Sequence, residues 1–212
     1  MSAKDKLISD IISAEWDMFQ NTTNIGGRAS CQDNRPQFIL MRRAQFSVWP
    51  EALLKSYFRD LTAAKEEGLN LITSKYAYMM KSTMPEYFSD IESRLPEITP
   101  EKQELVDRIS SIHSKWSADF SEKYPYITGQ GRPTSSEADG PQSTSVETYT
   151  KGEMLTYSVE TLRLYRDFTD QMQAEDRNMV YEVRENIVKA MGYTDIASAE
   201  ETLAQLFSTQ SR

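Results

Sequence analysis

The chain has 212 residues, more acidic than basic side chains (32 Asp and Glu against 24 Lys and Arg) and a single cysteine, Cys31. This length suits one domain over residues 1–212, and one cysteine excludes an internal disulfide or a thiolate-rich metal site. The acidic balance, without a dense Lys/Arg cluster, argues against nucleic acid as a partner. No stretch approaches the roughly 20 apolar residues that span a bilayer, so we predict a cytoplasmic protein without membrane contact.

Apolar residues recur at helical spacing along most of the chain and predict an all-α fold, a compact helical bundle. The predicted helices are 3–20, 36–48, 50–67, 69–82, 85–94, 100–123, 145–157, 158–175, 177–191 and 196–208. Thr144 and Glu147 match a capping box, and Ser158 is placed to cap the following helix. The segment 124–145 is rich in Gly, Pro, Ser and Thr, which predicts a long loop, either ordered or flexible.

The two halves of the chain, residues 1–98 and 99–212, show a weak internal similarity. A shift of 108 positions places Gln45 on Glu153 and Asn70 on Asn178. Duplication and chance both explain so few matches. If the duplication is real, the halves pack about a pseudo-twofold axis and a ligand site is expected between them.

Several apolar stripes carry a charged or amide side chain where a leucine is expected. Glu15 continues the stripe of the first helix, Arg42 and Gln45 lie in the stripe of the second, and His113 and Glu153 do the same in the second half. An isolated buried charge costs several kcal/mol, so these groups need partners, shifted pKa values or a wet cavity. The pattern therefore predicts either a buried ion-pair network, or exposed residues on rotated helices, or a polar pocket between the halves.

The glycine-rich segment before the second helix offers another candidate. Cys31 lies close to a helix N-terminus and to Arg28, an environment that stabilises a thiolate. Backbone donors near Arg28 could instead bind a carboxylate or phosphate, with a counterpart at Arg132, and a tight turn that needs glycine explains the segment equally well.

Residues 15–19, 26–32 (Gly-Gly-Arg-Ala-Ser-Cys-Gln), 45–46 (Gln-Phe), 75–80 (Lys-Tyr-Ala-Tyr-Met-Met) and 147–153 (Glu-Thr-Tyr, then Gly-Glu) together resemble a microbial family known as a domain of unknown function. The likeness covers most of the chain. It implies a shared fold and supplies no reaction, cofactor or catalytic residue. A family-like Leu-Arg-Gly-Glu-Leu stretch reads Thr-Lys-Gly-Glu-Met at 150–154 here, so an arginine that could bind a ligand is missing.

Metal and cofactor motifs are scarce. One histidine and one cysteine exclude the common zinc sites, and neither a Walker A lysine motif nor a dinucleotide fingerprint is present. We predict no cofactor and no metal site, although a Mg²⁺ or Mn²⁺ ion held by carboxylates is not ruled out by composition.

Our leading hypothesis from sequence is a small-molecule lyase, isomerase or hydrolase in which Glu15 and Glu153 act as acid and base on an anionic metabolite. The predicted substrate-binding residues are Arg28, Cys31, Gln32, Arg42, Gln45, Arg132, Glu147, Tyr149 and Tyr157. The alternative is a non-catalytic helical module that binds a partner protein, forms a homo-oligomer or senses a ligand.

Overall fold

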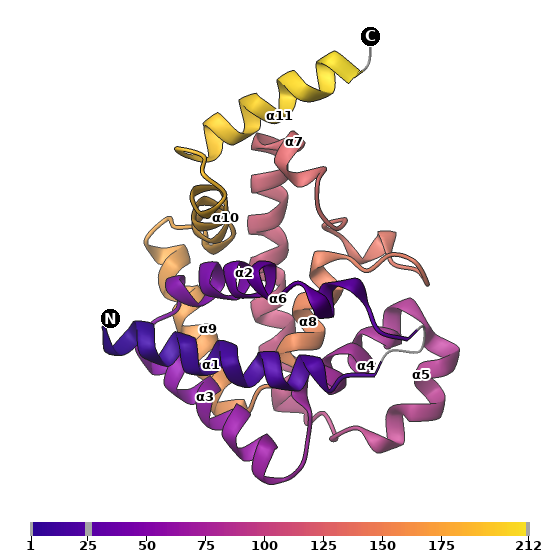
Figure 1. The fold of residues 1–212 in the computed structure, drawn as a ribbon. Helices are drawn as coiled ribbons and strands as arrows, with labels where there is room; N and C mark the ends of the chain where they lie inside the picture. Colours follow the sequence, from indigo (N-terminus) through magenta and orange to yellow (C-terminus); the bar gives the residue numbers. More distant parts are fainter. Residues whose placement is uncertain (1, 24–26, 211–212) are drawn as a thin grey trace.

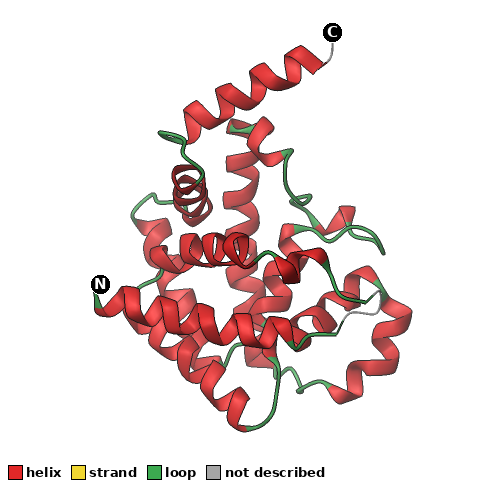
Figure 2. Ribbon diagram, viewed as in Figure 1, coloured by secondary structure: helices red, strands yellow, loops and turns green. Residues whose placement is uncertain are grey.

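The computed structural model describes residues 2–23 and 27–210, and over these ranges the chain forms helices and no β-strand (Figures 1 and 2). Gly26 of the glycine-rich segment lies outside the described residues. The α-helices are α1 (Ala3–Gln20), α2 (Arg35–Val48), α3 (Glu51–Glu66), α4 (Leu71–Thr83), α5 (Pro85–Ile91), α6 (Pro100–Lys123), α7 (Pro125–Thr128), α8 (Val146–Met154), α9 (Val159–Ala174), α10 (Met179–Ala190) and α11 (Ile196–Gln210). Short 3₁₀ turns are η1 (Ser30–Asp33), η2 (Glu92–Arg94) and η3 (Ser136–Ala138).

The all-α prediction is confirmed, and every predicted helix is present with small shifts at its ends. Helices α4 and α10 begin two residues later than predicted, because Asn70 and Asn178 are their N-caps. Each asparagine side chain accepts a hydrogen bond from a backbone N–H of the first turn, at Thr73 and Tyr181 respectively. Such a cap satisfies a donor that the helix itself leaves free and so fixes where the helix starts.

The start of α8 differs from the predicted capping box. Ser145, and not Thr144, is the N-cap of this helix. The carboxylate of Glu147 accepts a hydrogen bond from the backbone N–H of Ser136 instead, at 3.0 Å. The capping-box prediction is therefore wrong, whereas Ser158 caps α9 as predicted.

The loop between α6 and α8 contains α7 and η3 and is held by specific hydrogen bonds. The carboxylate of Asp139 accepts from the backbone N–H of Ser145 at 2.6 Å and from the hydroxyl of Ser82 at 2.5 Å. Because Ser82 belongs to α4, these contacts attach the loop to both α4 and the start of α8.

One apolar core contains side chains from both halves of the chain. Its centre is an aromatic cluster in which Trp49 lies 5.0 Å from Tyr165 and Tyr57 lies 4.8 Å from Tyr157, measured between ring centroids. Helix α3 packs against α9, α2 against α10, and α4 against α8. Helix α11 extends away from this body and contacts it through α7 and α10 (Figure 1).

Helix bounds and N-cap asparagines recur at positions related by the 108-residue shift, whereas the carbonyls that these asparagines bind, at Met18 and Trp116, are 98 positions apart. Helix α3 starts at 51 and α9 at 159, and they end at 66 and 174. Asn70 donates its amide N–H to the carbonyl of Met18 on α1, while Asn178 donates to the carbonyl of Trp116 on α6. The duplication stays a prediction; in the structure, α2 packs against α10 and α8 packs against α4.

Candidate functional site

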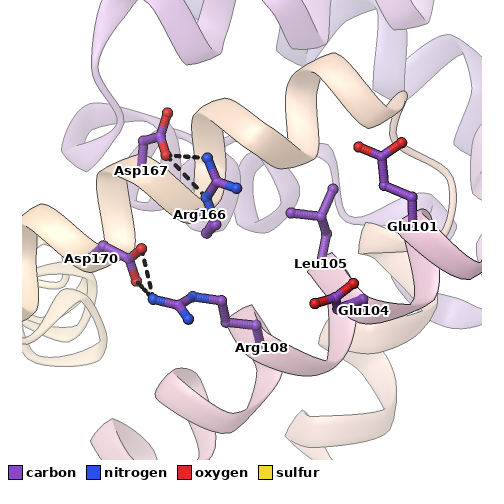
Figure 3. Close-up of a pocket in the computed structure, with 7 residues that line it drawn as sticks. All are labelled: Glu101, Glu104, Leu105, Arg108, Arg166, Asp167 and Asp170. Carbon is purple, nitrogen blue, oxygen red and sulfur yellow. Dashed lines mark hydrogen bonds and ion pairs between the residues drawn. The ribbon is translucent and has the colours of Figure 1, made fainter.

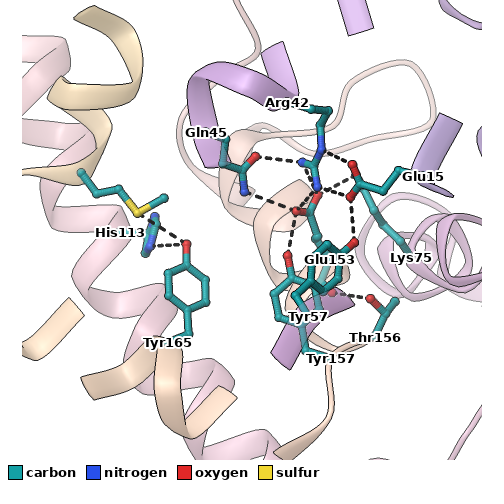
Figure 4. A network of polar contacts seen from close by, with 11 residues as sticks. Glu15, Arg42, Gln45, Tyr57, Lys75, His113, Glu153, Thr156, Tyr157 and Tyr165 are labelled. Atoms are coloured by element: carbon teal, nitrogen blue, oxygen red, sulfur yellow. Dashed lines mark hydrogen bonds and ion pairs between the residues drawn. The ribbon is translucent and has the colours of Figure 1, made fainter. Parts of the chain in front are cut away.

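A buried ion network joins α1, α2 and α8 (Figure 4). The guanidinium of Arg42 binds Glu15 through two N–H groups, with Nε at 2.7 Å from Oε2. It also donates to both carboxylate oxygens of Glu153, at 3.0 and 3.3 Å, and to the amide oxygen of Gln45 at 2.8 Å. Every N–H group of Arg42 therefore has an acceptor within the protein.

A second cation, Lys75 of α4, completes the network. Its Nζ donates to Oε2 of Glu153 at 2.9 Å and lies 3.5 Å from the centroid of the Tyr149 ring. The hydroxyls of Tyr57 and Tyr157 donate to Glu15 and Glu153, at 2.7 and 2.8 Å. Two carboxylates thus face two cations, so the network is electrically neutral and densely hydrogen-bonded.

The protonation states follow from these contacts. Burial alone raises the pKa of Glu153, but the charges of Arg42 and Lys75 outweigh this effect and hold that pKa well below its usual range. Burial and the neighbouring carboxylates raise the pKa values of Tyr57 and Tyr157 well above normal, so both phenols stay protonated. Near neutral pH, Glu153 has no proton to donate as a general acid.

A cavity of about 700 Å³ lies against this network, between α2, α4, α8 and α10. Arg42, Gln45 and Lys75 form its polar wall, whereas Glu15 and Glu153 lie behind them and do not line it. The rest of the lining is largely apolar or aromatic: Phe19, Phe38, Met41, Ile72, Tyr76, Val146, Tyr149, Val183 and Ile187. Burial, with the nearby Tyr149, raises the pKa of Tyr76 to about 12.

Two further arginines line the cavity, and neither makes an ion pair with a described residue. Arg132 donates to the backbone carbonyl of Thr144 at 3.2 Å, and its guanidinium carbon lies 5.2 Å from the centroid of the Tyr149 ring. Arg184 of α10 makes no hydrogen bond to a described residue, and burial lowers its pKa. Because the described lining residues include no Asp or Glu, the cavity wall carries unneutralised positive charge.

The family described as a protein of unknown function (DUF4125) matches residues 5–201. The chain belongs to the DUF4125 family. This assignment confirms the resemblance to a domain of unknown function. Neither the comparison with curated proteins nor that with solved structures gave a match. The part matched to DUF4125 contains every residue of the ion network and the cavity wall.

The structure brings together part of the site that the sequence predicts. Glu15, Arg42, Gln45, Glu153 and Tyr157 share the ion network. Of the predicted residues, five line the cavity: Cys31, Tyr149, Arg132, Arg42 and Gln45.

Other predicted substrate-binding residues lie elsewhere. Arg28 is bound to Asp33 and to the side chain of Gln20, outside the cavity lining. Gln32 is buried, and its amide donates to the carbonyls of Phe19 and Thr22. Both residues therefore fix the conformation of the chain around η1, and the structure does not place them in the cavity.

Three residues of this region were not in the predicted site. Lys75 is in a stretch rich in methionine and tyrosine that reads as ordinary core, but it is itself a charge in the stripe of Ile72 and Met79. Arg184 interrupts an apolar face between Val183 and Ile187. The same signal that identified Arg42, a charged residue in an apolar stripe, could have found Lys75, whereas the acidic neighbours of Arg184 hide this signal. Tyr57 gave no comparable signal, because an aromatic residue is ordinary in a core.

The described ranges offer no support for a second charged binding site, a metal site or a membrane span. A surface hollow of about 430 Å³ between α6 and α9 is lined mostly by charges that already pair, Arg108 with Asp170 and Arg166 with Asp167, and its remaining lining residues are Leu105 and the acidic Glu101 and Glu104 (Figure 3). Among the described residues, no group of three His, Cys, Asp or Glu side chains is arranged to hold a metal ion. No described helix combines the length and apolar content that crossing a membrane requires.

His113 of α6 does not line the 700 Å³ cavity but lines a smaller hollow beside it, with its Nε2 at 3.1 Å from the hydroxyl of Tyr165. Burial lowers the pKa of His113 to about 4, so the unfolded chain, with an ordinary histidine pKa near 6.5, binds more protons than the folded chain between these values. Stability contributed by neutral His113 is present above pH 6.5 and is lost as pH falls towards 4.

We therefore expect the His113→Gln variant to lose less stability than the wild type between pH 7 and pH 5. The loss of stability between these pH values should differ by about 1–2 kcal/mol between the two proteins. This figure is smaller than the full pKa shift of His113 would give, because the residue is partly exposed. Urea denaturation at several pH values measures it, and His113 is the chain's only histidine, so no other imidazole contributes. Parallel pH profiles for the two proteins would contradict the assignment of a neutral, buried histidine.

Proposed function

We propose that the chain binds a small organic anion in the cavity beside the Arg42 network. In this proposal, the guanidinium groups of Arg132 and Arg184 hold a carboxylate or phosphate, and the aromatic and aliphatic wall holds an apolar part of the same molecule. The observation that carries the proposal is the pair of arginines without carboxylate partners in a cavity whose described lining contains no acidic residue.

Electrostatics supports an anion as the occupant. A guanidinium removed from water costs several kcal/mol unless an anion compensates it. The fully buried cations of this region, Arg42 and Lys75, have such partners in Glu15 and Glu153, whereas Arg184 is partly buried and Arg132 is exposed. Arg184 has none among the described residues, although burial already lowers its pKa. A planar carboxylate or phosphate matches the paired N–H groups of a guanidinium and would supply the missing charge.

In this proposal the two carboxylates have a supporting role. Glu15 and Glu153 are both ion-paired with Arg42 and neither lines the cavity, so they hold Arg42 and Lys75 in the wall. This arrangement favours binding over the acid–base reaction that the sequence predicts for Glu15 and Glu153. Likewise, Arg42 has no N–H left for a ligand, which favours Arg132 and Arg184 as the anchors.

The test is the binding of 1-naphthyl phosphate, a flat apolar group with a terminal anion, measured by isothermal titration calorimetry. We expect saturable binding to the wild type, weakened roughly 10- to 100-fold by Arg184→Gln, because charge-assisted hydrogen bonds are lost. The matched control is Arg163→Gln, since Arg163 is exposed and pairs with Glu101 away from the cavity. No saturable binding, or equal weakening in both variants, would overturn the proposal.

Cys31 gives an independent readout of the same experiment. It is the only cysteine, it is exposed, and it lines the cavity. Naphthyl phosphate at about ten times its dissociation constant should slow alkylation by uncharged N-ethylmaleimide, because the bound molecule covers the side of the exposed thiol that faces the cavity. An unchanged alkylation rate would place the bound phosphate outside this cavity.

A further inference from the structure

A second hollow, of about 190 Å³, adjoins the cavity and shares Arg132 and Arg184 with it. The two arginines therefore lie where the hollows meet. The linings differ in character: aromatic and aliphatic side chains dominate the larger cavity, whereas serine and threonine hydroxyls from α6 and the following loop are frequent in the smaller hollow. Glu147, one of the predicted substrate-binding residues, also lines the smaller hollow, and its carboxylate is paired with Lys151.

Ser110 and Ser117 of α6 are the informative residues of the second hollow. Their exposed fractions are only 2% and 8%, and no described residue forms a hydrogen bond with either hydroxyl. Among the described side chains, only Trp49 Nε1 is a fully buried polar atom without a partner, so the two serine hydroxyls reach the space of the hollow. Two hydroxyls without protein partners in one hollow favour an occupant that forms hydrogen bonds with them. The size of the hollow corresponds to about six water molecules, or one glycerol-sized group.

We infer that the ligand is a phosphodiester whose phosphate lies at Arg132 and Arg184, with an aromatic or acyl substituent in the larger cavity and a small hydroxylated substituent in the hollow of Ser110 and Ser117. This inference rests on the proposed function and specifies its ligand class. A carboxylate or phosphomonoester ends a molecule, whereas a phosphodiester carries its charge between two substituents. The second arrangement lets one ligand occupy both hollows while its anion meets the shared arginines.

The experiment compares two diesters of equal charge, methyl 1-naphthyl phosphate and 2,3-dihydroxypropyl 1-naphthyl phosphate. We expect the dihydroxypropyl diester to bind the wild type about tenfold more tightly, because only its hydroxyls reach the two serines. In the Ser110→Ala/Ser117→Ala variant this preference should fall below about twofold, with the affinity for the methyl diester unchanged. Ser89→Ala, on the exposed face of α5, is the control that should keep the preference.

A second variant tests the inference even if the Ser110→Ala/Ser117→Ala variant does not fold. Ser114 lines the same hollow but is exposed, so Ser114→Leu adds bulk there without altering the buried serines. It should weaken the dihydroxypropyl diester at least about tenfold and leave the methyl diester unaffected. If naphthyl phosphate binds but the dihydroxypropyl diester gains nothing over the methyl diester, the diester inference fails and the anion site stands. If no naphthyl compound binds, both fail.

Discussion

The Glu153→Gln variant is expected to lose about 3–5 kcal/mol of the free energy of unfolding. The carboxylate of Glu153 faces Arg42 and Lys75, and all three side chains are buried. Gln keeps the size and one acceptor oxygen but removes the negative charge, so the network is left with one uncompensated positive charge away from water. Urea denaturation with linear extrapolation measures the loss.

The control for Glu153→Gln is Glu160→Gln, because Glu160 pairs with Arg59 and both side chains are largely exposed. Exposed pairs contribute at most about 1 kcal/mol, so this change should cost little. The double variant Lys75→Met/Glu153→Met removes one charge of each sign and should recover much of the stability lost by Glu153→Gln. A loss below about 1 kcal/mol for Glu153→Gln would mean that the carboxylate is not buried between its two cations.

The ion network also predicts how the stability of the protein changes at low pH. Because the folded pKa of Glu153 lies below its unfolded value near 4.5, the stability it contributes is complete above that value. That stability is lost as pH falls from about 4.5 through the lower folded pKa. The neutral His113 acts in a higher window, from pH 6.5 towards 4, so the two groups can be distinguished by the pH at which their variants differ from wild type.

Positions related by the 108-residue shift differ in their charge and in their partners. Tyr57 donates to Glu15, whereas Tyr165, 108 positions later, bonds to the neutral His113. The position 108 residues after Arg42 is Thr150, so the second half has neither the acid nor the arginine at these places. The network is instead closed across the halves, by the contact of Arg42 with Glu153.

The helices could be predicted because apolar periodicity and explicit caps act locally. Where the error was one or two residues, a neighbouring polar side chain decided the boundary, as at Ser145 and Asn178. The ion network was predictable in part for a similar reason. Glu15, Arg42 and Glu153 interrupt apolar stripes, and a buried charge is costly unless a charge of the opposite sign pairs with it.

The cavity was harder to predict, because it depends on how segments far apart in the sequence pack. Arg184 is flanked by Glu182 and Glu185, which resembles a solvated helix face, and its lack of an ionic partner is visible only in three dimensions. Arg28 and Gln32 precede a helix in a segment without periodicity, so nothing in the sequence indicates which way their side chains point. The structure shows that these side chains form hydrogen bonds with neighbouring residues instead, Arg28 with Asp33 and Gln32 with the carbonyl of Phe19.

Gly152 is the residue at which a single added side chain should disturb both the fold and the site. A Cβ atom at Gly152 on α8 would lie 2.7 Å from Cγ of Met79 and 3.0 Å from the backbone oxygen of Lys75 on α4. The methionine side chain can move, but the carbonyl moves only if α4 moves. We expect Gly152→Val to cost about 2–3 kcal/mol by overpacking. For Gly152→Ala the crowding is partly offset by the better helix propensity of alanine, so its cost is about 1 kcal/mol.

The effect of Gly152→Val on binding should accompany its effect on stability. Separating α8 from α4 moves Glu153 and Tyr149 away from Lys75, and Lys75 and Tyr149 both line the cavity. Naphthyl phosphate should then bind more weakly to the folded variant at a temperature well below its melting point. The control is Gly140→Ala, because a Cβ atom at Gly140 would meet no heavy atom within 4 Å, and it should change neither stability nor binding. If Gly152→Val is as stable as the wild type and binds as well, the close approach of α4 and α8 does not position the cavity wall.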